Sequence, residues 1–117
     1  MTAECIFCRI AKKEMPSSVI YEDADVMAFH DIAPQAPVHA VFISKEHISG
    51  VADIRDVSVA GKMIAAINSV VKSGKLGGSL KQEGFRIVVN SGKNGGQAVP
   101  HLHFHLLGGR QMDWPPG

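Results

Sequence analysis

The segment between Val57 and Val71 has the clearest hydrophobic pattern in the chain. Its apolar residues recur at steps of three and four, at Ala60, Met63, Ile64, Ile67, Val70 and Val71. This spacing lines them along one side of a helix, the side that packs against the rest of a protein. The glycines Gly74, Gly77 and Gly78 then favour a loop. The pattern therefore predicts an amphipathic helix over 57–71.

Shorter runs of alternating or β-branched residues predict strands separated by turns. We expect strands at Ser18–Tyr21, Asp25–His30, Val38–Ile43, Phe85–Asn90 and His101–Leu107. One or two helical turns are expected over Cys5–Lys13, ended before Pro16 because the residue preceding a proline disfavours helical geometry. Helices and strands that do not alternate regularly favour an α+β domain, with an antiparallel sheet and helices on one face. Its core is expected to contain Phe42, Phe85 and Phe104.

Composition and charge narrow the class of protein. The chain has 117 residues, of which 45% are hydrophobic and 20% charged, which predicts a single globular domain over residues 1–117. A net charge of +1, with scattered Lys and Arg, provides no basic stripe for nucleic acid. No run approaches the roughly 18 apolar residues of a membrane span, and the first residues lack a signal-peptide pattern. We expect a cytoplasmic protein with neither a membrane nor a nucleic-acid partner.

The last predicted strand carries the strongest candidate for chemistry. Three histidines, His101, His103 and His105, alternate there with Leu102, Phe104 and Leu106. Successive side chains of a strand point to opposite faces, so the three imidazoles should share one face. Each imidazole titrates near neutral pH and offers one donor and one acceptor, so the group provides nucleophile, base and acid.

The segment before these histidines, Asn90–Val99, is rich in glycine. Its backbone N–H groups can turn inward to bind an anion such as phosphate. Anion donors beside candidate nucleophiles suit displacement at phosphorus. Two chemistries then compete: histidines that hold a catalytic zinc, or a neutral histidine that attacks phosphorus and forms a covalent intermediate. The spacing of the histidines leaves both open.

Four segments together resemble the histidine triad (HIT) superfamily, and in particular its Hint branch, the histidine triad nucleotide-binding proteins. They are Ala28–Ile32, Pro34–His39, Gly96–Leu107 and Gly108–Gly117. The resemblance implies a HIT fold, in which a five-stranded antiparallel sheet with two helices dimerises into a ten-stranded sheet. It also implies hydrolysis of purine nucleoside 5′-phosphoramidates, and of acyl-adenylates as further substrates, through a nucleotidyl-histidine and without a catalytic metal.

The resemblance also implies roles for individual residues. His103 would be the nucleophile, His105 would contact the phosphate, His39 would relay a proton and His101 would orient the site. The nucleotide would be bound by Asp31 at the ribose, by Ile32 at the base, and by Asn90, Gly96, Gln97, Ala98 and Val99 at the phosphate. Trp114, in a tail that crosses the dimer, would shape the partner's pocket. An attacking imidazole also needs its other nitrogen held by an acceptor, which we expect to be a backbone carbonyl.

Two further features qualify this picture. Ala98 stands where the Hint branch usually carries a serine, so one side-chain hydrogen bond to the phosphate or leaving group is lost.

Cys5 and Cys8 form a C-x-x-C pair, which in a reducing cytosol is more often a metal or redox site than a disulfide. Some bacterial members of the superfamily hold a structural zinc with such a pair and two histidines, which here would be His47 and His101. Two thiolates and two imidazoles suit a closed tetrahedral zinc site.

Two alternatives to the phosphoramidase remain. A dinucleoside polyphosphate hydrolase or nucleotidyl transferase of the same superfamily is disfavoured by the Hint-like tail. A non-catalytic nucleotide-binding module, in which Ala98 marks the loss of activity, is disfavoured by the complete set of three histidines.

Overall fold

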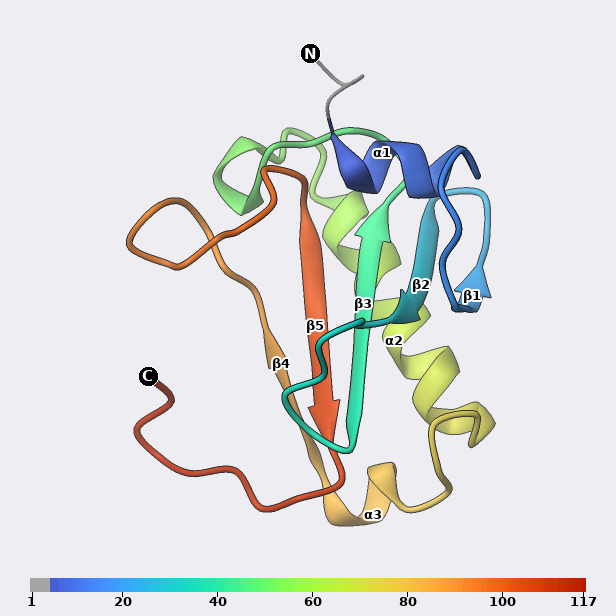
Figure 1. Cartoon of the computed structure of the whole chain (residues 1–117), viewed down its shortest axis with the longest axis vertical. Helices are drawn as coiled ribbons and strands as arrows, with labels where there is room; N and C mark the ends of the chain where they lie inside the picture. Colours follow the sequence, from blue (N-terminus) through green and yellow to red (C-terminus); the bar gives the residue numbers. More distant parts are fainter. Residues whose placement is uncertain (1–4) are drawn as a thin grey trace.

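The computed structural model describes residues 5–117 and contains one antiparallel sheet of five strands in the order β1-β2-β3-β5-β4 (Figure 1). The strands are β1 (Val19–Glu22), β2 (Val26–His30), β3 (Val38–Ser44), β4 (Phe85–Val88) and β5 (His103–Gly108). The helices are α1 (Ile6–Ala11), the 3₁₀ turn η2 (Val51–Asp53), α2 (Ser58–Ser73) and α3 (Leu80–Glu83).

Helix α2 covers one face of the sheet, as its apolar stripe predicts. Its residues Met63, Ala66, Ile67, Val70 and Val71 are buried there with residues of the strands, among them Phe42, Phe104 and Leu106. The helix ends at Gly74, whose φ of 76° is a left-handed conformation that glycine adopts without strain. The predicted amphipathic helix is therefore confirmed, and it extends two residues beyond Val71.

The expectation that the helices share one face is wrong. Helix α1 lies against the opposite face, where Ile10 packs with Met27, Phe29, Val41 and Ile43. Figure 1 shows α1 across the end of the sheet where β3 finishes and β5 begins, with α2 on the far side. Because β2 and β3 carry apolar residues on both faces, each face needs a cover. The histidines lie on this same face, where Phe7 of α1 packs against His101 and His103.

Some boundaries and one core residue also differ from expectation. β5 begins at His103, so His101 lies just before the strand, and β4 ends at Val88, before Asn90. The short helix α3 lies in the segment expected to be a loop. Phe42 and Phe104 are buried, but Phe85 is 36% exposed because β4 is an edge strand that α2 does not cover. Within residues 5–117, no helix is both long and apolar enough to cross a bilayer.

Candidate active site and metal centre

His103 is buried at the start of β5. Its Nδ1 lies 2.6 Å from the carbonyl oxygen of His101. Because a carbonyl only accepts hydrogen bonds, Nδ1 carries the proton and the lone pair of Nε2 is free. A backbone carbonyl thus holds this imidazole, as expected, and leaves it in the form that a nucleophile requires.

His105 and His39 form a second hydrogen-bonded unit on neighbouring strands. The backbone N–H of Gln35 donates to His39 Nδ1 at 3.0 Å, so His39 carries its proton on Nε2. That nitrogen lies 2.8 Å from His105 Nδ1, which therefore accepts, and His105 keeps its own proton on Nε2. Asp31 Oδ2 lies 3.4 Å from the same Nε2 of His39. The rings of His103 and His105 stand 5.0 Å apart, centroid to centroid.

The direction of these hydrogen bonds bears on whether Asp31, His39 and His105 bind a metal or act without one. The ligand atoms of Asp31, His39 and His105 lie within 4.8 Å of one another, close enough to suggest a metal site. A neutral histidine that binds a metal through one nitrogen carries its proton on the other, which then donates to an acceptor. At His39 the other nitrogen instead accepts from Gln35. The hydrogen bonds of this cluster therefore run from Gln35 through His39 to His105, which does not suit metal ligation by His39.

The free protein keeps His105 uncharged at neutral pH. Burial lowers the pKa of His105 to about 4, and the neighbouring His103 and His39 add to the effect. A bound anion favours the charged form of a nearby imidazole. A phosphate group beside this ring would raise its pKa and strengthen proton donation from Nε2.

An apolar cavity of about 530 Å³ lies on the same side of the sheet. Its lining includes Ile6, Phe7, Ile10, Phe29, Asp31, Ile32, Val41 and Val99. His103 itself does not line the cavity, but the ring of Phe7, which does, contacts His103 edge-on, with centroids 5.0 Å apart. Of its residues, Asp31, Ile32 and Val99 are candidates from the sequence. The contribution of α1 was missed, although the spacing of Ile6 and Ile10 is that of one helix face.

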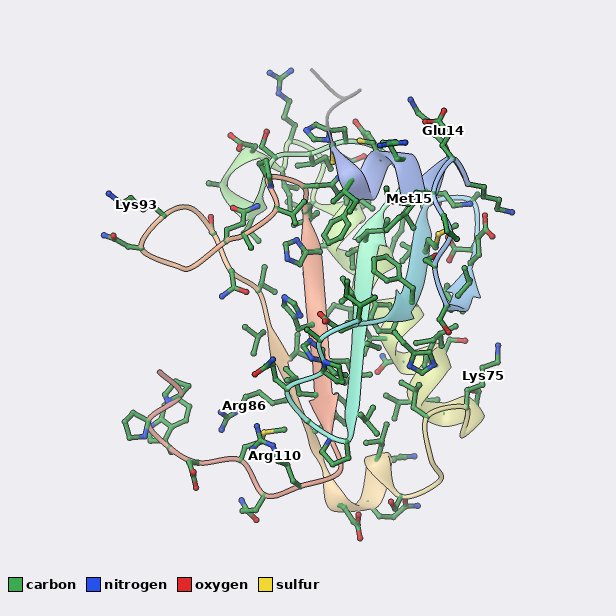
Figure 2. All side chains as sticks on the ribbon, in the orientation of Figure 1. Glu14, Met15, Lys75, Arg86, Lys93 and Arg110 are labelled. Atoms are coloured by element: carbon green, nitrogen blue, oxygen red, sulfur yellow. The ribbon has the colours of Figure 1, made fainter. Side chains whose placement is uncertain are left out.

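The glycine-rich loop is held together largely by its own polar groups. The N–H groups of Gly96 and Gln97 donate to the carbonyls of Lys93 and Gly92. The side chains of Asn90 and Gln97 also bond to main-chain groups, Asn90 to Gly95 and Gln97 to Gly92, Ser49 and Val99. Among residues 5–117, no partner is found for the N–H groups of Ala98 and Val99, so these two donors are open to an anion. Figure 2 shows Lys93 at the loop tip, pointing away from the sheet.

A separate cluster of cysteines and histidines lies between α1 and the start of β5. The Sγ atoms of Cys5 and Cys8 and the Nδ1 atoms of His47 and His101 all lie within 4.8 Å of one another. Cys5 Sγ is 3.2 Å from His101 Nδ1, and Cys8 Sγ is 3.1 Å from His47 Nδ1. Zinc bonds of about 2.0 to 2.3 Å place tetrahedral ligand atoms roughly 3.3 to 3.8 Å apart, close to these distances.

The protonation of this cluster suits a metal. His101 Nε2 lies 2.6 Å from the carbonyl oxygen of Ser44 and donates to it, which leaves the Nδ1 lone pair facing the thiols. Burial lowers the pKa of His101, so the ring is neutral, as a ligand must be. In the metal-free chain, burial and the neighbouring Cys5 raise the pKa of Cys8 to about 11. Zinc binding would release that proton.

Residues 12–112 match the HIT domain family. The chain belongs to the histidine triad family. It is 46% identical to a protein named 14 kDa zinc-binding protein from Brassica juncea, over 97% of the chain and 100% of that protein. It is also 46% identical to a protein named Adenylylsulfatase HINT1 from Arabidopsis thaliana, over 96% of the chain and 76% of that protein. The crystal structure of a HIT family hydrolase from Legionella pneumophila superposes with a TM-score of 0.90 at 41% identity, covering 97% of the chain and 100% of that structure.

These matches confirm the histidine triad fold and identify the chain as a hydrolase of that family. The expected structural zinc is confirmed by the donor set and by relatives named for zinc binding. It is distinct from the relay of His39 and His105. The C-terminal tail does not line the cavity of its own chain. Trp114 is exposed, and the Arg86 guanidinium, which donates to the carbonyl of Asp113, lies over its ring. Its role in a partner's pocket stays a prediction.

Proposed function

We propose that this protein hydrolyses purine nucleoside 5′-phosphoramidates to a nucleoside monophosphate and an amine. The observation that carries the proposal is the bond from His103 Nδ1 to the carbonyl of His101, which leaves Nε2 as a free nucleophile beside the cavity. The purine would enter the apolar cavity near Ile32. Asp31, whose Oδ1 already accepts from the Ala33 N–H, would bind the ribose hydroxyls through its other oxygen.

The first step forms a bond from His103 Nε2 to phosphorus and breaks the phosphorus–nitrogen bond. The leaving amine must take up a proton, which His105 Nε2–H would supply. A neutral His39 that gave up its Nε2 proton would be left as an imidazolate. The pair of His39 and His105 would therefore first take up one proton from solvent when the anionic phosphate binds, and it would return to neutrality when the protonated amine leaves. The open N–H groups of Ala98 and Val99 would bind the phosphoryl oxygens, where negative charge develops.

The second step returns the site to its starting state. Water attacks the phosphorus of nucleotidyl-His103, the bond to Nε2 breaks, and nucleoside monophosphate leaves. One water proton restores the relay, which acts as a base in this step. The tautomer of His103 need not change, because Nδ1 keeps its proton and its bond to His101 throughout.

An adenylyl sulfate is a second candidate substrate, because one relative at 46% identity is named an adenylylsulfatase. The same attack by His103 would displace sulfate instead of an amine. Sulfate is a very weak base and leaves without a proton, whereas an amine must be protonated before it can leave. The two substrates therefore differ in their need for the relay formed by His39 and His105.

We also propose that the protein is a homodimer, as the resemblance to the Hint branch implies, and that it is cytoplasmic, as its sequence predicts. β4 is an edge strand, and on it Phe85 and Ile87 are more than a third exposed. Ile87 pairs with Leu106, so it lies on the face that α2 covers elsewhere. A second copy that continued the sheet at β4 would bury this apolar strip. Sedimentation should give a dimer for the native chain and a monomer for Ile87→Lys; a native monomer would contradict the proposal.

The test of the activity is steady-state hydrolysis of adenosine 5′-phosphoramidate by the native protein and by His103→Ala, each with and without a chelator. We expect release of adenosine monophosphate by the native protein only, with kcat at saturating substrate unchanged when the chelator is added. A prompt loss of kcat at saturating substrate, in a chelated protein that is still folded, would indicate a catalytic metal. No activity at all would favour a polyphosphate hydrolase, a nucleotidyl transferase or a non-catalytic nucleotide-binding module.

A further inference from the structure

Helix α1 takes part in two sites at once. Cys5, at its N-terminal cap, and Cys8, within it, supply two of the four zinc ligands. The residues between and after them, Ile6, Phe7 and Ile10, line the apolar cavity. A single short helix therefore joins the metal centre to one wall of the cavity that adjoins His103.

Besides the metal ligands, the packing of Phe7, Ile10 and Ala11 against the sheet holds the helix. It is six residues long, and isolated helices shorter than about 12 to 15 residues are marginal in water. Ile10 is buried against the sheet, but Ile6, at the other end, is 42% exposed. At that end the fixed points are the cysteines, which face His47 and His101 from other parts of the chain. Anchoring of the N-terminal turn thus depends on the ligand cluster.

Phe7 transmits the position of the helix to the catalytic strand. Its ring centroid lies 5.0 Å from that of His103, 5.9 Å from that of His101 and 5.7 Å from that of Phe29. All three contacts are edge-on, an arrangement favoured for aromatic pairs. A shift of α1 would remove the cavity wall and the cover of His103 together.

We propose that metal loading at Cys5, Cys8, His47 and His101 controls nucleotide affinity, because the ligated cluster holds α1 as a wall of the nucleotide cavity. This inference rests on the proposed function, since it takes the cavity to be the nucleotide site. It assigns the zinc centre a part in substrate binding in addition to stability. The position of His103 on β5, and with it the tautomer set by His101, depends less on the metal, because the sheet holds it.

Two measurements on zinc-loaded and chelated protein, both kept reduced, test the proposal. The first is hydrogen exchange of the amides of residues 6–11; the second is the calorimetric Kd for adenosine monophosphate. We expect chelation to raise exchange in α1 while β3 and β5 stay protected. The Kd should rise by at least about tenfold, the equivalent of 1.4 kcal/mol of lost contact. Both changes should reverse when zinc is added back.

A matched pair of variants tests the wall without touching a metal ligand. Ile6 and Ile64 are both helical and both 42% exposed, but Ile6 lines the cavity from α1 and Ile64 lies on α2. In zinc-loaded protein, Ile6→Ala should weaken binding of adenosine monophosphate several-fold, and Ile64→Ala should not change it. This pair tests the contribution of the α1 wall to binding even if the chelated protein unfolds.

Three results would overturn the proposal. They are an equal Kd with and without zinc, equal exchange in residues 6–11, or an unchanged Kd in Ile6→Ala. A zinc-loaded protein that fails to bind adenosine monophosphate at all would overturn the proposed function as well. A failure of zinc dependence alone would leave that function standing.

Discussion

His103 donates from Nδ1 to the main-chain carbonyl of His101, 2.6 Å away, while the side chain of His101 faces the zinc ligands. The residue that completes the metal cluster thus also fixes the tautomer of the proposed nucleophile. The two sites are adjacent but chemically separate: one gathers lone pairs around a metal position, and the other presents a single lone pair beside a cavity.

Replacing His39 should affect the two candidate substrates differently. In His39→Gln the relay to His105 is broken, and the turnover of a phosphoramidate with a basic amine should fall by about 10² to 10⁴-fold. Turnover of adenylyl sulfate should fall much less, because sulfate leaves without a proton. Parallel kcat measurements on both substrates check this. Equal losses on both would mean that His39 acts in some way other than proton transfer to the leaving group.

Stability should depend on pH through the buried histidines. The folded-state pKa of His105, about 4, lies below its ordinary value of 6.5, and that of His101 is also lowered. Between pH 4 and 6.5 the unfolded chain binds more protons than the folded chain. The free energy of unfolding is therefore highest above pH 6.5 and falls as the pH drops towards 4.

Denaturant titrations at several pH values, in saturating zinc, measure this slope. The slope measures how many protons the chain takes up on unfolding. His105→Gln should lower that number by less than one between pH 4 and 6.5, because the His105 side chain is only half-buried. Parallel pH profiles for the native protein and the variant would show that His105 already titrates near its ordinary value.

Zinc removal should lower the melting temperature as well as nucleotide affinity. Structural zinc in isolated fingers binds with about 10 to 16 kcal/mol. In a domain of this size, each kcal/mol of lost stability lowers Tm by roughly 4 °C, so the loss of even a few kcal/mol is measurable. We expect a drop of at least about 10 °C on chelation, and a similar Tm for Cys8→Ser with and without chelator. A chelated native protein that kept its Tm would show that the cluster is not structural.

Ala98 offers a gain-of-function test. Its exposed position lies near the end of the glycine-rich loop, and its N–H is one of the two open donors. Ala98→Ser would add a hydroxyl that can bond to the phosphate or the leaving group. A hydrogen bond to a charged group contributes about 1.5 to 3 kcal/mol, so kcat/KM should rise by at most about 10 to 100-fold. Ala98→Val, which adds only carbon atoms, should give no rise in kcat/KM. An equal rise in both variants would show that the hydrogen bond of the serine hydroxyl is not its cause.

The sequence predicts the local parts of the fold better than their arrangement. The stripe of α2 and the alternation of histidines with Leu102, Phe104 and Leu106 depend on neighbouring residues, and both are found. The placement of α1 on the opposite face could not be read locally, because Met27 and Val41 look like ordinary strand residues until the sheet is assembled. The exposure of Phe85 has the same cause, since only the strand order makes β4 an edge.

The candidate site shows the same limit. The residue types and the family resemblance pointed to His39, His103, His105 and the four zinc ligands, which the structure brings into two clusters. The direction of each hydrogen bond came only from the structure, because it depends on backbone groups of Gln35, Ser44 and His101. Those bonds, rather than the residue types, distinguish a proton relay from a metal site.

The most direct test of the central claim is to trap the covalent intermediate. The native protein, mixed rapidly with an adenosine 5′-phosphoramidate and quenched without acid, should gain the mass of one adenylyl group, located on His103 by peptide mass spectrometry. The adduct should form equally fast with a chelator present for the duration of the mixing, and His103→Ala should form none. An adduct on another residue, or hydrolysis by the native protein with no adduct at any mixing time, would contradict nucleophilic catalysis by His103.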